Sequence, residues 1–194
     1  MTKLLRPLAP LLTCLAAALL LPACSSPPVS LYKLTAERHP PTAGGIGIGI
    51  GVGPVTTADY LSRSNLILQE GPHKLTPAES HRWAGDLDDN ITHVIAANLG
   101  SQLRTSHVLT YPWTGDDGLK YQITLDIREL HGHSEGHALL EASWRIYALP
   151  ARTLLTTRTW TATEPLTADG YEELVAAESR LLARLARQIA AELR

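Results

Sequence analysis

The chain has 194 residues and a formal net charge of −2 at pH 7, which fits one ordinary domain. A weakly acidic chain without basic clusters argues against nucleic-acid binding and against electrostatic attachment to anionic lipids. Its two cysteines are Cys14 and Cys24, both near the N-terminus, which excludes a disulfide framework or a cysteine-based metal site in the rest of the chain.

The first 23 residues have the pattern of a secretory signal. Lys3 and Arg6 precede an apolar run at residues 11–21, and the small Ala23 comes directly before Cys24. The run is shorter than the roughly 20 apolar residues that span a bilayer. Leu21 to Cys24 resembles the bacterial lipobox, in which the cysteine is acylated and becomes the first residue. The alternative is a soluble secreted protein with a chance cysteine at the cleavage site.

The lipobox divides the chain into three parts. We expect a lipoprotein signal peptide at residues 1–23, a lipidated tether at 24–30 and a single domain at 31–194. Three acyl chains on Cys24 would exceed the two signals that stable anchoring requires. Ser25 stands where an aspartate would signal retention in the inner membrane, so we expect the outer membrane, with the domain facing the periplasm.

Residues 46–55 alternate isoleucine or valine with glycine, and this period of two predicts a strand with one apolar and one bare face. The spacing G-x-G-x-x-G is not met, and no Walker lysine follows, so a nucleotide site is not indicated. We expect a central strand whose glycine face admits close approach of a helix or another backbone.

A hairpin is predicted at residues 65–69 and 73–76, followed by a helix. Thr76 to Glu79 fits a capping box with Pro77 at the first helical position, although Ser80 is an alternative N-cap. The helix is expected to run to about residue 103, because apolar or amide side chains recur at three- and four-residue spacing. These positions are Trp83, Leu87, Ile91, Val94, Ile95, Asn98, Leu99 and Leu103.

Strands are expected next at residues 107–111, 121–127, 138–146 and 153–163, and a second amphipathic helix from Tyr171 to the C-terminus. This order predicts an α/β fold in which a mixed β-sheet is covered by two long amphipathic helices.

Three histidines, His131, His133 and His137, form the best candidate metal site, because histidines two residues apart in a strand point to one face. They fall at the tip of a predicted hairpin, where we see no acidic partner to orient them and expect a solvated turn. Glu129 and Glu135 are typical of charged turns. We therefore expect no enzyme and no cofactor.

A partner interface is the other candidate site. Tyr60, Leu61 and Arg63 lie in a predicted loop, and Pro112 and Trp113 follow a strand. Aromatic side chains in loops are typical of interfaces. They are also typical of a core in a chain without phenylalanine, which is the interpretation we favour for Trp83.

Short motifs in order along the chain carry a family resemblance: Tyr32-x-Leu34, Ile50-Gly51-Val52-Gly53-Pro54-Val55, Tyr60-Leu61-x-Arg63, Arg82-Trp83-Ala84, Ala97-Asn98-Leu99, Pro112-Trp113 and the helix from Tyr171. With the lipobox they resemble the PqiC family of ABC-type transport auxiliary lipoproteins. The chain departs from it at Ser62, where we expect aspartate, and at Gly85-Asp86, where we expect Glu-Pro.

The resemblance implies a fold similar to the N-terminal domain of TolB and a non-enzymatic outer-membrane lipoprotein. It also implies a partner, a mammalian-cell-entry (MCE) protein that bridges the periplasm, within a system that moves lipids between the two membranes. Because MCE assemblies are ringed, the resemblance makes self-association of the lipoprotein an expectation.

Three hypotheses about function follow. The first is an adaptor that docks the MCE protein. The second is a carrier that holds lipid in a cavity lined by the strand at residues 46–52 and the second helix. The third, which we favour least, is a metal-dependent hydrolase that uses the three histidines. A filled core favours the adaptor, and a deep cavity favours the carrier.

Overall fold

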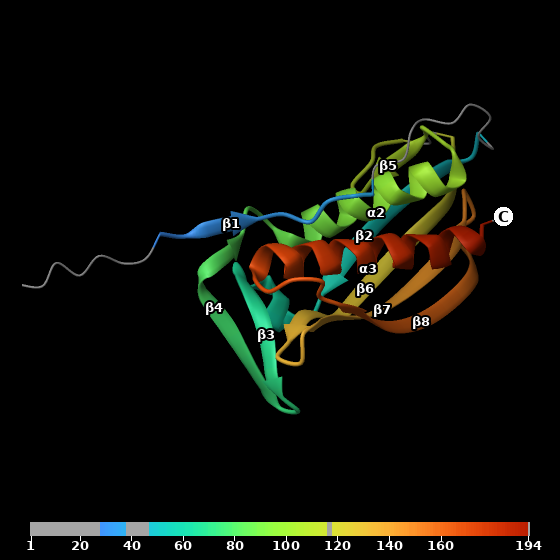
Figure 1. The fold of residues 1–194 in the computed structure, drawn as a ribbon. Helices are drawn as coiled ribbons and strands as arrows, with labels where there is room; N and C mark the ends of the chain where they lie inside the picture. The colour runs from blue at the N-terminus through green and yellow to red at the C-terminus, as the bar shows by residue number, and fades with distance from the viewer. Residues whose placement is uncertain (1–27, 38–46, 116–117, 194) are drawn as a thin grey trace, which may run out of the picture.

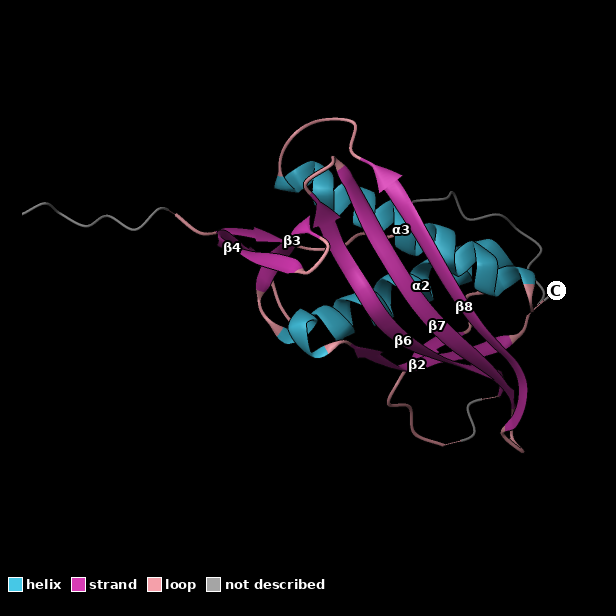
Figure 2. Ribbon diagram, turned by 90° about the horizontal axis from the view of Figure 1, so that it is seen from below, coloured by secondary structure: helices cyan, strands magenta, loops and turns pink. Residues whose placement is uncertain are grey.

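The computed structural model describes residues 28–37, 47–115 and 118–193. The expected signal peptide and Cys24 lie outside these residues. The described chain forms an eight-stranded sheet with two long helices, both on one face of the sheet (Figures 1 and 2). The strands are β1 Ser30–Tyr32, β2 Gly49–Thr57, β3 Asn65–Gly71, β4 Lys74–Trp83, β5 Val108–Thr110, β6 Leu119–His133, β7 His137–Ala148 and β8 Thr153–Pro165, and the helices are η1 Asp59–Ser62, α2 Leu87–Leu103 and α3 Tyr171–Ala191.

The long strand β6 organises the sheet. Along one edge it pairs antiparallel with β7, which in turn pairs with β8. Along its other edge it pairs in parallel first with β2 and then, at Gly132 and His133, with β3. β5 extends the sheet beyond β2, while β4 and β1 extend it beyond β3. The fold is therefore the mixed α/β sheet covered by two helices that the sequence predicted.

The core lies between the sheet and the helix layer. Alternate residues of the strands point to the helices, as the period of two predicted: Ile50 and Val52 of β2 and Ile123 and Ile127 of β6 have no exposed surface. α2 covers β2 and β5, whereas α3 covers β7, β8 and part of β6. Within the described residues, neither helix is long and apolar enough to cross a membrane.

Residues 33–37 directly follow β1 and run beside the helix layer (Figure 1). Their backbone is hydrogen-bonded to side chains of both α2 and α3. The N–H of Leu34 donates to Oδ1 of Asn90 at 2.7 Å, and Nδ2 of Asn90 donates back to the Leu34 carbonyl at 3.2 Å. The Thr35 N–H donates to Oγ of Ser179, and the Glu37 N–H to Oδ1 of Asn98. We call residues 33–37 the strap.

The predicted start of the first helix is wrong. Thr76 to Glu79 belongs to β4, and the helix begins at Leu87 instead of at Pro77. Pairing with β3 overrides the local capping signature, because Thr76 lies opposite Leu68 and Pro77 opposite Ile67. Pro77 is tolerated there because the register shifts next to it. Trp83 ends β4 and is buried, as expected of a core residue.

Candidate functional site

The Tyr60 loop is formed by η1, which follows the end of β2. Leu61 is 3% exposed and belongs to the core. The Tyr60 hydroxyl donates to Nδ1 of His131 at 2.9 Å, and Nε2 of His131 donates to Oε1 of Gln69 at 3.0 Å. Tyr60 and Leu61, both predicted to meet a partner, therefore make contacts within the fold itself.

The pKa values in this network follow from burial. Burial raises the pKa of Tyr60 to about 12. It lowers the pKa of His131 to about 4, with His133 and His137 adding to the effect. His131 is therefore neutral at physiological pH, in keeping with one ring nitrogen that accepts and one that donates.

Arg63, directly after η1, is exposed. It lies at the edge of a surface cleft of about 340 Å³, whose other side is the start of α2 with Asp86, Asp88 and Asp89. Asp88 accepts a hydrogen bond from the Thr57 hydroxyl at 2.8 Å. The cleft is a charged surface feature and lacks the apolar lining that a lipid chain requires.

Trp113 fills the bare face of β2. A Cβ atom built at Gly51 would lie 2.6 Å from the Trp113 ring, so only glycine leaves room for the indole. Tyr111, 54% exposed, meets the same ring edge-on, with centroids 5.6 Å apart. The close approach expected on the glycine face is therefore made here by a side chain. Pro112 beside it is exposed.

The predicted interface residues occupy two different points along β2. The Tyr60 loop follows the last residue of the strand, Thr57, whereas Trp113 packs on Gly51, near its first residue. Arg63 and Pro112 are exposed, Tyr60 and Trp113 are half-buried, and Leu61 is buried.

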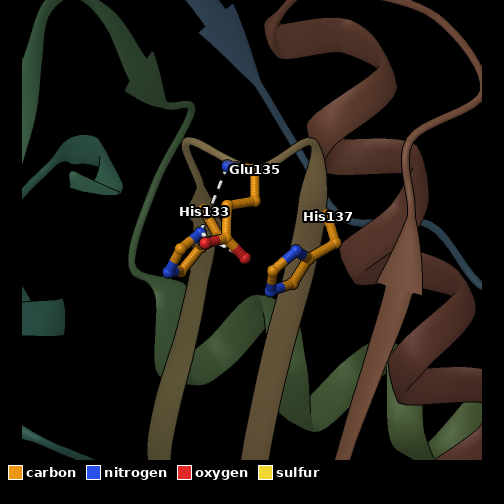
Figure 3. Close-up of side chains that lie close together, drawn as sticks. All are labelled: His133, Glu135 and His137. Carbon is orange, nitrogen blue, oxygen red and sulfur yellow. Dashed lines mark hydrogen bonds and ion pairs between the residues drawn. The ribbon is translucent and has the colours of Figure 1, made fainter. Parts of the chain in front are cut away.

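The three histidines do not form one cluster. His131 is 2% exposed and uses both ring nitrogens within the protein. His133 and His137 instead face each other across the β6–β7 turn, with rings stacked at 4.6 Å between centroids and 11° between planes. Figure 3 shows Glu135 beside the His133 ring, and its carboxylate lies 3.8 Å from Nδ1 of His133.

The three histidines considered as candidate metal ligands are thus replaced, as a cluster in space, by two histidines and a glutamate. Sequence reasoning assigned Glu135 to an ordinary charged turn and found no acidic partner for the histidines. The missed signal is the spacing His133-x-Glu135-x-His137. A tight turn between the paired strands brings these three residues close together. The candidate ligand atoms of the three residues all lie within 4.8 Å of one another.

Comparison with known proteins gives the family. Residues 32–190 match the family model described as the ABC-type transport auxiliary lipoprotein component. Over 141 residues the chain is 28% identical to the intermembrane transport lipoprotein PqiC of Escherichia coli strain K12, a match that covers 72% of each chain. The PqiC of Shigella flexneri matches to the same extent.

Two solved structures share the fold. A crystal structure of an uncharacterized protein has a TM-score of 0.73 at 21% identity, covering 87% of this chain and all of that one. A protein from Xanthomonas campestris has a TM-score of 0.67 at 15% identity, covering 82% of this chain and 92% of its own. At these identities the likeness concerns the fold alone.

Proposed function

The chain belongs to the family of ABC-type transport auxiliary lipoprotein components, and from this membership we propose that it is an adaptor in an intermembrane lipid transport system. In this proposal the lipid chains on Cys24 hold it at the outer membrane, on the periplasmic side. Its folded body docks the end of a periplasm-spanning MCE protein and performs no chemistry of its own.

The filled core is the observation that favours an adaptor over a carrier. A lipid cavity would need the apolar faces of β2 and α3 to stand apart. Instead, Ile50 and Val52 of β2 and Leu181 and Leu185 of α3 are all fully buried in one hydrophobic cluster. Two surface clefts among the described residues, one beside Arg63 and one beside Arg152, are lined largely by polar side chains.

We propose that the docking surface includes Arg63 and Pro112, which are exposed, together with Trp113, which is half-buried. Arginine and tryptophan are typical of the residues that dominate binding energy at interfaces. Leu61, in the core, and Tyr60, through its hydrogen bond to His131, hold the loop that carries Arg63. A Tyr60→Ala variant would break the buried bond to His131 and so confuse a folding defect with a binding defect.

The test is a pull-down of the intact lipoprotein from its native membrane. Wild type is compared with Arg63→Glu and with Lys74→Glu, which makes the same charge change on an exposed side chain of the β3–β4 hairpin. Recovery of an MCE-domain protein with wild type and Lys74→Glu, but not with Arg63→Glu, supports docking at this loop. Recovery with all three moves the docking site elsewhere on the body, and recovery with none overturns the adaptor function.

A further inference from the structure

The β6–β7 turn brings together side chains that suit a transition metal. Two imidazoles and one carboxylate are ligands that zinc-type ions prefer, whereas calcium and magnesium prefer oxygen ligands throughout. His133 and His137 are paired residues at the end of the β6–β7 ladder, so their backbones are fixed opposite each other. Glu135 projects from the turn between them (Figure 3).

The turn is held in place from several sides. The Gly136 N–H donates to the His133 carbonyl at 3.0 Å, which closes the turn itself. The Ser134 N–H donates to the Gln69 carbonyl of β3, and the Leu166 N–H, just after β8, donates to the Gly136 carbonyl, both at 2.9 Å. Neighbouring elements therefore position the turn that carries the candidate ligands, which lowers the entropic cost of binding an ion.

We propose that this turn binds one divalent transition-metal ion through His133, Glu135 and His137. In a tetrahedral site with zinc about 2 Å from each ligand atom, two ligand atoms lie about 3.3 Å apart. The observed limit of 4.8 Å therefore requires a closure of up to about 1.5 Å. Rotation of the Glu135 side chain, 76% exposed, and of the two rings supplies it.

Three protein ligands leave a fourth tetrahedral position open on the exposed side of the turn. A water molecule or a ligand group from a bound molecule would occupy that position. His131 is not part of the site, because its ring nitrogens are already bonded to Tyr60 and Gln69.

The test is a zinc titration by calorimetry on the whole chain, purified in detergent without a histidine tag and stripped with chelator. We expect one zinc ion per chain. His133→Ala and His137→Ala should each weaken binding roughly 100-fold, since loss of even outer-shell partners costs about 10- to 100-fold in metal affinity. His73→Ala is the matched control, because His73 is an exposed histidine on the adjacent hairpin turn.

Thermal melting provides a second readout. Zinc should raise the Tm of wild type and of His73→Ala but not that of the double variant His133→Ala, His137→Ala. All three proteins should melt alike in chelator, because the substituted side chains lie at turns. Absence of stoichiometric zinc binding, or equal binding by the double variant, overturns the site.

Discussion

At the scale of single residues, one acidic side chain lies in the core of the described residues, and burial alone shifts its pKa. Glu178 of α3 is 2% exposed, and its Oε2 atom has no hydrogen-bond partner among the described residues. Burial raises the pKa of this carboxyl from an ordinary 4.5 to about 8. The folded protein therefore keeps it protonated at pH values where the unfolded chain has released the proton.

The consequence is a stability that falls as the pH rises. Since the folded pKa is the higher one, the contribution of Glu178 to the free energy of unfolding is complete below pH 4.5 and is lost towards pH 8. Glu178→Gln carries no such ionisation. Relative to wild type, we expect this variant to gain about 3 kcal/mol between pH 5 and pH 8, measured by urea unfolding. Glu172→Gln, exposed on the same helix, should gain nothing, and an equal gain in both variants would contradict the assignment to burial.

At the scale of elements, the predictable parts are those with a local period. Residues 121–127 and 138–146 alternate, and both form strands; the periodic segment from Tyr171 forms α3. The capping signature at Thr76 failed because pairing with β3 is a long-range contact. Strand register, which is also set by long-range contacts, decides that Trp113 packs on Gly51 and that Tyr60 bonds to His131. Sequence patterns therefore identified these candidate residues but not the residues that they contact.

The strap shows how side chains on the helices position an extended segment. Asn90→Ala removes both hydrogen bonds to the Leu34 peptide while keeping a good helix former in α2. We expect a loss of about 1–3 kcal/mol in unfolding free energy, because buried peptide groups lose their partner. Hydrogen exchange at the Leu34 amide should accelerate more than exchange in β6. His93→Ala, exposed on the same helix, is the control, and unchanged exchange at Leu34 in Asn90→Ala would show that the strap is held by other contacts.

At the scale of the whole molecule, the strap links the fold to the expected membrane anchor. β1 pairs with β4, and the hydroxyl of Tyr32 at its end is hydrogen-bonded to Nδ1 of His81 at 2.8 Å. Residues 30–37 are thus held against the folded body. The six residues Ser25 to Ser30 reach roughly 20 Å when extended. A lipidated Cys24 would therefore hold the β1 end of the body close to the membrane surface.

The anchor itself is tested by Cys24→Ser. Without the thiol no acyl chain can be attached, and we expect the protein to move from the outer-membrane fraction to the soluble periplasmic fraction. Its Tm should stay unchanged, because the family match and the described strands begin after Cys24. Cys14→Ser is the matched control: it changes the other cysteine, inside the predicted signal, and should leave the protein in the membrane. If Cys24→Ser still sediments with the outer membrane after a high-salt wash, attachment depends on the folded body, and a soluble secreted protein that binds a membrane partner becomes the better description.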